Sequence, residues 1–284
     1  MIGFDKTKIK VVVVDLDETI LHKGELRPGV ADVLERINDM GIEVIIATGR
    51  QLRDIPVEVR VMQFIRYYIT LNGASVFDCG ENKRISHLPI DRELVLDIMA
   101  VTKGRVAYEH LLYDEKAILA KENAGRSAKR FENLYIGDRY KDYEALLEIV
   151  DDPAEYIIEN SIAIYKMVFY FYDPELCKKI LAELNEKFDV EAILVSDLDI
   201  ELTARGASKG AGVLQLSESL GFAMSETVAI GDSGNDAEML RVAGFPIAMG
   251  NASDELKSLA LLVAPTVTEE GAVTVLEQLF FGDS

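Results

Sequence analysis

Short apolar runs alternate with stretches of helical spacing at both ends of the chain. Four valines follow Lys10, and the run stops abruptly at Asp15. Between residues 30 and 40 apolar side chains recur every three or four positions, and Gly41 stands where a helix C-cap belongs. A second β-branched run then ends at Thr48. This strand–helix–strand rhythm predicts a parallel sheet covered by helices.

The pattern changes between residues 83 and 202. This segment contains the strongly alternating run IYKMVFYFYD and several weaker helical stretches. After residue 203 the first rhythm returns as helix, strand, helix and strand. We therefore predict an α/β protein with a Rossmann-like parallel sheet core formed by residues 1–82 and 203–284, and a separate α+β domain, residues 83–202, inserted into it.

Composition restricts the classes of partner. The 284 residues are 49% hydrophobic and 28% charged, as in an ordinary globular protein. The net charge of −19 argues against binding to nucleic acid or to an anionic membrane surface. It also means that an anionic substrate would need a local Lys, Arg or metal ion.

The cysteines and the apolar runs indicate a cellular address. Cys79 and Cys177 show no CxxC spacing, which favours a reducing compartment over a disulfide scaffold or a zinc site. The first ten residues lack the apolar core of a signal peptide, and no apolar run is long enough to span a bilayer. We expect a cytoplasmic protein without a membrane partner. No feature of the sequence indicates an oligomeric state.

Polar residues occupy the ends of the predicted strands. Asp15 and Asp17 follow the first strand, and Thr48 ends the second. Asp232 follows the strand predicted at residues 227–230, and Lys209 opens a helix soon after the inserted segment. Because the carboxyl ends of parallel strands share one edge of a sheet, these side chains are expected to converge there.

The chemistry of these residues is complementary. Three carboxylates provide the hard oxygen ligands that Mg²⁺ prefers. The Thr48 hydroxyl and the Gly49 amide can donate to a phosphate oxygen, and Lys209 supplies a positive charge for the same group. A carboxylate pair at i and i+2, such as Asp15 and Asp17, can divide the roles of nucleophile and general acid.

Four short motifs occur in a fixed order along the chain: DLDET, ATGR, SKG and GDSGND. Together with LNGASVFD and MGNASDELKSLA, they resemble the haloacid dehalogenase (HAD) superfamily, and in particular the Cof-type phosphatases with a C2B cap. The resemblance covers both core segments closely and the inserted segment only by position and length. It implies a HAD fold with a cap, and Mg²⁺-dependent hydrolysis of a small phosphorylated metabolite through an aspartyl-phosphate. A sugar phosphate is the first expectation, and sugar-acid phosphates, pyridoxal phosphate and flavin mononucleotide stay open as substrates.

The resemblance also implies a role for each matched residue. Asp15 would be the nucleophile, and Asp17 the general acid and later the base for the hydrolytic water. Thr48 and Lys209 would bind the transferring phosphate. Mg²⁺ would be held by Asp15, Asp232 and the backbone carbonyl of Asp17.

Further residues are expected to support the site or to touch the substrate. The Thr19 hydroxyl is expected to fix the turn of the nucleophile loop, and Asn235 and Asp236 to orient the lysine and the metal ligands. Glu18 stands where many relatives have Gly, and we interpret it as a bystander. Candidate substrate contacts are Arg50, Asn72 and Gly73 in the core, with Arg105, Glu109, Lys166 and Arg205 as weaker candidates in or near the inserted segment.

Other functions stay open at this point. A phosphomutase of the phosphomannomutase type would need a second phosphate site, and no Arg cluster is evident in the inserted segment. A phosphoacceptor switch, like the receiver domains of signalling proteins, would need neither the insert nor a second carboxylate at i+2. The motifs GxxxxGK[ST] and GxGxxG are absent, so kinase and dehydrogenase interpretations lack their phosphate cradles.

Overall fold

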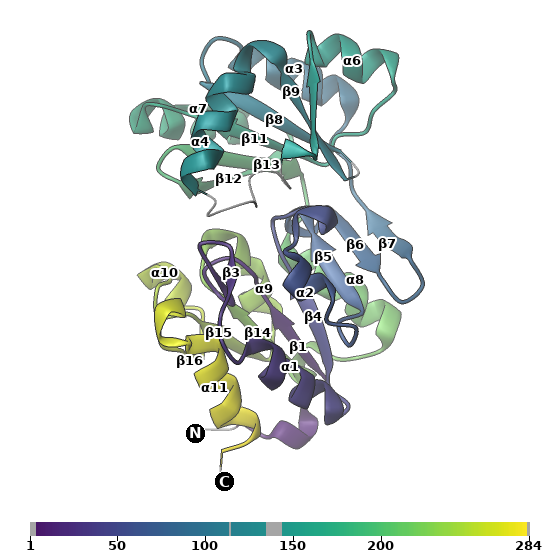
Figure 1. Cartoon of the computed structure of the whole chain (residues 1–284), viewed down its shortest axis with the longest axis vertical. Helices are drawn as coiled ribbons and strands as arrows, with labels where there is room; N and C mark the ends of the chain where they lie inside the picture. Colours follow the sequence, from purple (N-terminus) through teal and green to yellow (C-terminus); the bar gives the residue numbers. More distant parts are fainter. Residues whose placement is uncertain (1–3, 114, 135–143, 283–284) are drawn as a thin grey trace. The chain divides into compact units, whose positions relative to one another are not determined.

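The computed structural model describes residues 4–113, 115–134 and 144–282, with only the backbone for residues 131–134. The chain divides into two compact units (Figure 1). The core unit comprises Met1–Arg50, Ile55–Ser86 and Ser208–Ser284, and the inserted unit comprises Gln51–Asp54 and His87–Ala207.

The predicted boundaries, 82/83 and 202/203, lie a few residues before those of the structure. The first predicted boundary falls at the start of a strand and the second falls within a strand, and each strand belongs to the preceding unit. Strand β7 (Lys83–His87) extends the sheet of the core unit, and β13 (Asp199–Ala204) belongs to the sheet of the inserted unit.

An eight-stranded sheet organises the core unit, in the order β16-β15-β14-β1-β4-β5-β6-β7. Neighbours from β16 to β5 are parallel, and β6 is antiparallel to β5. This confirms the predicted α/β fold with a parallel sheet. The remaining strands are β1 (Val11–Val14), β4 (Glu43–Ala47), β5 (Tyr67–Thr70), β6 (Ser75–Asp78), β14 (Thr227–Gly231), β15 (Phe245–Ala248) and β16 (Leu262–Val263).

The four valines of β1 form the centre of this sheet, and all four are buried. Val14 pairs with Ile230 of β14 on one side and with Ile46 of β4 on the other. The three strands therefore end level with one another. The residues that follow them are brought to one edge, as the sequence predicted.

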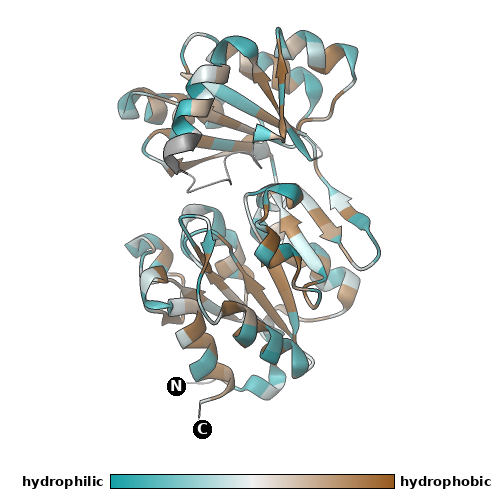
Figure 2. Ribbon diagram, viewed as in Figure 1, coloured by the Kyte–Doolittle hydropathy of each residue, from teal (hydrophilic) through white to brown (hydrophobic). Residues whose placement is uncertain are grey.

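Helices cover the sheet of the core unit. Helices α8 and α9 pack on the face that presents Val11 and Val13, while α1 packs against α11 and β4. The strands in the interior are mostly hydrophobic, and polar residues lie on the outward helix faces (Figure 2). The helices are α1 (Val30–Asp39), α2 (Val57–Arg60), α8 (Lys209–Leu220), α9 (Ala237–Val242), α10 (Asp254–Lys257) and α11 (Gly271–Phe280). The hairpin β2 (Leu21–His22) and β3 (Glu25–Leu26) and the 3-10 turns η1 (Lys6–Lys8), η3 (Leu71–Gly73), η5 (Met224–Glu226), η6 (Gly234–Asp236) and η7 (Val267–Glu269) complete the unit.

The inserted unit has a six-stranded, mostly antiparallel sheet in the order β10-β9-β8-β11-β13-β12. One face of this sheet carries a separate hydrophobic core, which includes Met167 and Phe169. The unit is of the predicted α+β type. Its further strands are β8 (Tyr108–Tyr113), β9 (Lys116–Ala120), β10 (Leu147–Val150), β11 (Lys166–Tyr170) and β12 (Val190–Ser196), and its helices are η2 (Leu52–Asp54), α3 (Arg92–Thr102), η4 (Lys121–Asn123), α4 (Ala124–Leu134), α6 (Pro153–Glu159) and α7 (Pro174–Lys187).

Candidate active site

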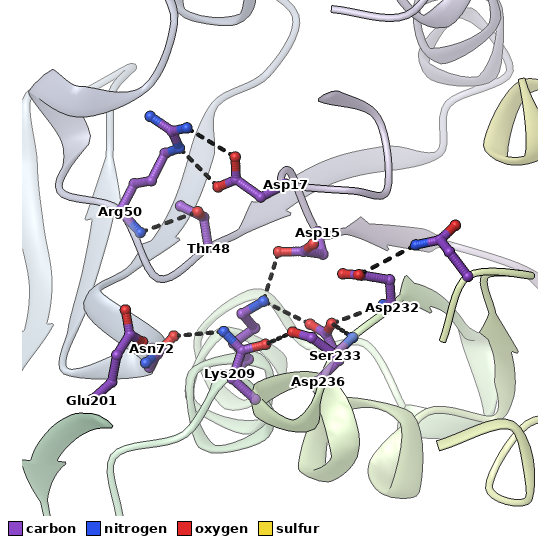
Figure 3. A network of polar contacts seen from close by, with 12 residues as sticks. Asp15, Asp17, Thr48, Arg50, Asn72, Glu201, Lys209, Asp232, Ser233 and Asp236 are labelled. Atoms are coloured by element: carbon purple, nitrogen blue, oxygen red, sulfur yellow. Dashed lines mark hydrogen bonds and ion pairs between the residues drawn. The ribbon is translucent and has the colours of Figure 1, made fainter. Parts of the chain in front are cut away.

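Asp15 lies directly after β1 and is buried. Its N–H donates to the carbonyl of Ile230 (3.0 Å), which extends the pairing of β1 with β14 by one residue. Its carboxylate oxygen Oδ1 accepts a hydrogen bond from Lys209 Nζ at 2.6 Å (Figure 3). The strand thus holds a carboxylate in a fixed direction at the edge of the sheet.

Lys209 is the first residue of α8, and its side chain is only 1% exposed. Its amine donates to both Asp15 Oδ1 and Asp236 Oδ1, each at 2.6 Å. Burial opposes the charged form, but the two carboxylates outweigh this effect and raise the pKa of Lys209. The amine is therefore held as a buried cation between two acids.

A close backbone contact positions the start of α8. Gly73 has φ +89°, and a Cβ on this residue would lie 2.0 Å from the carbonyl oxygen of Ser208. Ser208 is the N-cap of α8, with its hydroxyl accepting from Ala211 N–H at 3.0 Å. Only glycine allows the turn after β5 to approach the helix this closely.

Asp15, Asp232 and Asp236 form an acidic cluster, with carboxylate oxygens within 4.8 Å of one another. Burial is the largest cause that raises the pKa of Asp15 to about 7 and that of Asp232 to about 9. The neighbouring carboxylates raise both pKa values further, and Lys209 opposes the shift. One lysine does not balance this cluster, so a bound cation would stabilise it.

Asp236 is fully buried, and its own hydrogen bonds occupy both of its oxygens. Oδ1 accepts from Lys209, and Oδ2 accepts from the N–H groups of Asp232 (2.9 Å) and Ser233 (3.0 Å) (Figure 3). Within the cluster, Asp15 and Asp232 are consequently the carboxylates better placed to bind a metal ion. Asp236 fixes the lysine and the loop that carries Asp232.

Arg50 makes a two-bond contact with Asp17. Its Nε donates to Asp17 Oδ2 and its second nitrogen, Nη2, to Asp17 Oδ1, both at 2.8 Å (Figure 3). The Arg50 N–H also donates to Thr48 Oγ1 at 3.1 Å, with Gly49 between the two residues at the end of β4. The guanidinium that the sequence suggested as a substrate contact therefore fixes the direction of Asp17.

Asn72 and Asn235 connect two of the loops at this edge. Asn72 adopts a left-handed backbone conformation (φ 55°), and its N–H donates to the Thr48 carbonyl at 3.1 Å. Its Oδ1 accepts from Asn235 Nδ2 at 3.1 Å, and Asn235 Oδ1 accepts from Ser233 Oγ at 2.7 Å. Both asparagines, one of them a suggested substrate contact, link the loop after β4 to the loop after β14.

The loop after Asp17 differs from the expectation at two residues. The buried Thr19 hydroxyl has no hydrogen-bond partner among the described residues, so it does not make the predicted turn-fixing bond. Backbone N–H groups that donate to the Leu16 carbonyl hold the turn instead. Glu18, interpreted as a bystander, has φ +54°, and its carboxylate accepts from His22 Nδ1 (2.9 Å) and Lys23 N–H (3.3 Å).

Asn251 is a site residue that sequence reasoning missed. Its Nδ2 donates to the Glu18 carbonyl (2.9 Å) and to Asp232 Oδ2 (3.3 Å), and its Oδ1 accepts from Val267 N–H (2.9 Å). A signal was present, because Asn251 follows the end of β15 closely. It is a polar side chain after a parallel strand, like Asp15 and Asp232.

The weaker candidates of the inserted segment make ion pairs within their own unit. Arg105 donates to Glu183 (2.6 Å), Arg205 donates to Asp189 (3.0 Å), and the buried Lys166 pairs with Glu201. His110 is buried beside Ser127, and burial lowers its pKa to about 3. Glu109 of β8 is partly buried, and its carboxylate accepts from the Thr102 hydroxyl at 3.5 Å.

Comparison with known proteins identifies the family. Residues 12–276 match the model of the haloacid dehalogenase-like hydrolases. The chain belongs to this family. Phosphatase YwpJ of Bacillus subtilis is 28% identical over 95% of this chain and 100% of its own length. The 5-amino-6-(5-phospho-D-ribitylamino)uracil phosphatase YcsE of the same organism is 26% identical over 94% of each chain.

A solved HAD structure supports the same assignment. The haloacid dehalogenase-like hydrolase from B. subtilis superposes with a TM-score of 0.81 and 25% identity, covering 96% of this chain and 99% of its own. The family match and these phosphatase relatives together show that the chain is a phosphoric monoester hydrolase. In the part of the chain that the structure describes, every helix is too short or too polar to cross a membrane.

Proposed function

We propose that this HAD phosphatase is Mg²⁺-dependent and hydrolyses the phosphomonoester of a small, hydroxyl-rich metabolite, a sugar phosphate, through an aspartyl-phosphate on Asp15. The observation that carries the proposal is the buried contact between Asp15 and Lys209 beside the Asp232 carboxylate. When a phosphoryl group is bound at Asp15, the buried Lys209 ammonium would stabilise its negative charge.

The contacts of each side chain support a division of roles. Lys209 holds Asp15 Oδ1, which leaves Oδ2 to attack phosphorus. As the bond from Asp15 to phosphorus forms and the ester bond breaks, Asp17 would give its proton to the leaving oxygen. In the second step Asp17 would take a proton from water, whose oxygen attacks phosphorus and releases phosphate and the Asp15 carboxylate. Arg50 would hold Asp17 in direction through both steps.

Mg²⁺ would be held by Asp15, Asp232 and the backbone carbonyl of Asp17. The fit rests on the donor set, since hard carboxylate oxygens are gathered with too little positive charge to balance them. When bound, the ion would neutralise charge on the phosphoryl oxygens. The Thr48 hydroxyl, which accepts from Arg50 N–H, keeps its proton available for a phosphate oxygen, and the adjacent Gly49 amide is expected to help.

The substrate class is supported by a relative. YcsE, by its name, acts on a metabolite with a phosphorylated ribityl chain. A phosphate ester on a hydroxyl-rich chain is therefore the first class to test for this chain. Cys79 and Cys177 form no disulfide, which suits the cytoplasmic location that the sequence predicted.

The proposal is tested by Asp15→Asn on a generic aryl phosphate and on a panel of sugar phosphates. The amide keeps an acceptor for Lys209 but cannot attack phosphorus, so turnover should fall about 1,000-fold or more. Chelation by EDTA should also abolish turnover of the unaltered chain, and added Mg²⁺ should restore it. Substantial residual turnover by the variant, or activity indifferent to EDTA, would contradict the proposal.

Asp78→Asn is the matched control. Asp78 is a buried carboxylate paired with Arg66 in the core unit, at the opposite end of β5 from the site. Its variant should lose stability and retain turnover per folded molecule. Product analysis separates the alternatives, because a switch would give one phosphorylation without continued release of phosphate, and a mutase would return a phosphorylated isomer.

A further inference from the structure

Asn251 joins three segments that are far apart in the sequence. Its amide nitrogen contacts Glu18 and Asp232, and its amide oxygen contacts Val267. The residue is exposed, yet both of its polar atoms are engaged with protein. An exposed side chain loses rotamer freedom when it is held in this way, and three hydrogen bonds offset that loss.

The base of this contact is a tightly packed backbone. Gly250 N–H donates to the Pro265 carbonyl at 3.2 Å, and a Cβ on Gly250 would lie 2.8 Å from Thr266 N. The backbone at Gly250 therefore packs directly against the backbone at Pro265 and Thr266, with no room for a side chain between them. Val267 N–H then fixes the Asn251 amide oxygen, so the amide nitrogen has a set direction.

One of the two Asn251 donor bonds acts on the loop that carries Asp15 and Asp17. Glu18 has φ +54°, a conformation that is unfavourable for a residue with a side chain. Asn251 binds the Glu18 carbonyl, while His22 and Lys23 bind its carboxylate. Contacts on both sides of this residue hold the strained backbone, which lies next to the Asp17 carbonyl proposed as a metal ligand.

The other donor bond acts on Asp232. Asn251 occupies Oδ2, and the Asp232 N–H donates to Asp236 Oδ2. Asn251 thus holds one carboxylate oxygen and Asp236 holds the backbone of the same residue, so Oδ1 is the oxygen better placed for a metal ion. The Asn251 amide group therefore fixes the distance between the Asp17–Glu18 loop and Asp232.

We propose that Asn251 is a positioning residue that fixes the Asp232 carboxylate and the Asp17–Glu18 loop relative to each other, and so prepares the geometry of the divalent cation site. The inference rests on the proposed metal site. It assigns Asn251 no contact with the substrate or with the reacting atoms. Residues of this kind typically change metal affinity by about 10- to 100-fold when they are removed.

The test is a calorimetric titration of the metal-free full chain with Mg²⁺, in the absence of substrate. Asn251→Ala removes all three hydrogen bonds, and Asn251→Leu does so with a side chain of the same branched shape. Both variants should bind Mg²⁺ about 10-fold or more weakly. At saturating Mg²⁺ their kcat on an aryl phosphate should return to within a few-fold of the original value, since no reacting group has been changed.

Two further variants separate the possible failures. Asn38→Ala removes one side-chain bond, to the Ile42 carbonyl, at the end of α1, and should leave Mg²⁺ affinity unchanged. Asp232→Asn should abolish Mg²⁺ binding if the metal site is correct. Loss of affinity in Asp232→Asn but not in the Asn251 variants would overturn only the positioning role.

The remaining outcomes are equally decisive. Unaltered Mg²⁺ binding in Asp232→Asn would overturn the metal site and the inference together. If Asn251→Ala, but not Asn251→Leu, lowers the thermal unfolding midpoint of the metal-free chain, the Mg²⁺ affinity of Asn251→Leu decides whether the positioning role holds. Weak Mg²⁺ binding combined with a kcat that saturating Mg²⁺ does not recover would also overturn the positioning role, because it would indicate direct participation in the reaction.

Discussion

A carboxylate that exchanges protons during a reaction needs a fixed direction. In this chain Arg50 gives that direction to Asp17, whose side chain is otherwise about half exposed. The geometry of the pair is two parallel N–H···O bonds, which lysine cannot reproduce. The contact also explains why an arginine follows Thr48 and Gly49 in this motif.

We expect Arg50→Gln to lower kcat on an aryl phosphate by about 10- to 100-fold, because a mobile Asp17 spends less time in line with the leaving oxygen. The measurement is steady-state kinetics at saturating Mg²⁺. The matched control is Arg241→Gln, which removes an exposed Arg–Glu pair on α9 and should leave kcat unchanged. An unchanged kcat in Arg50→Gln would show that Asp17 needs no such partner.

At the scale of elements, the site depends on how closely loops and helices approach. Lys209 reaches Asp15 because α8 begins beside the turn that contains Gly73. The contact is between backbones, so side-chain rearrangement cannot relieve a clash there. The position of the helix and the geometry of the site are therefore linked.

Gly73→Ala should destabilise the core unit and reduce turnover, since its Cβ would meet Ser208 O at 2.0 Å. Gly41→Ala is the control: this glycine has a similar φ of +80°, but nothing lies within 4 Å of its Cβ position. The control should lose about 1–2 kcal/mol for its backbone conformation. Gly73→Ala should lose about 1–3 kcal/mol more by overpacking, measured by urea unfolding. Equal losses in the two variants would contradict the importance of this contact.

At the scale of the whole molecule, two hydrophobic cores should give two responses to perturbation. The core unit and the inserted unit each bury their own set of apolar side chains. Glu109 is a titratable group in the inserted unit, and burial raises its pKa from an ordinary 4.5 to about 7. Its hydrogen bond from Thr102, at 3.5 Å, opposes this shift only weakly.

The stability of the inserted unit should therefore fall as pH rises. Below the ordinary pKa of 4.5 Glu109 is protonated in both states, and its contribution is complete. The contribution is lost as pH rises through about 7, because the folded chain must then carry a buried charge. The shift corresponds to about 3 kcal/mol at most.

Glu109→Gln should remove this pH dependence, and urea unfolding at about pH 5 and about pH 8.5 measures it. The unfolding free energy of the variant relative to the original chain should rise by about 2–3 kcal/mol between the two pH values. Glu186→Gln, at an exposed position of α7, is the control and should show no such change. A parallel response of both variants would contradict the assignment to Glu109.

Much of the fold could be read from the sequence because hydrophobic spacing and strand ends are local signals. The valine run, the helix before Gly41 and the polar residues after the strands predicted the parallel sheet and its edge. The boundaries at 82/83 and 202/203 were less accurate, because one fell at the start of a strand and the other within a strand, and the membership of each strand depends on its partner strands. Pairing between distant strands leaves no mark at a single position.

The sequence by itself determined which side chains stand at the edge of the sheet, since the order of strands and motifs places Asp15, Thr48, Lys209 and Asp232 there. Only the tertiary structure decided which of them touch. Three features were not predicted: the Arg50–Asp17 pair, the bonds of Asn251, and a Thr19 hydroxyl with no hydrogen-bond partner in the described part of the chain. The physical reason is that a hydrogen bond depends on distance and angle within a few tenths of an ångström, and those are set by the packing of segments far apart in the chain.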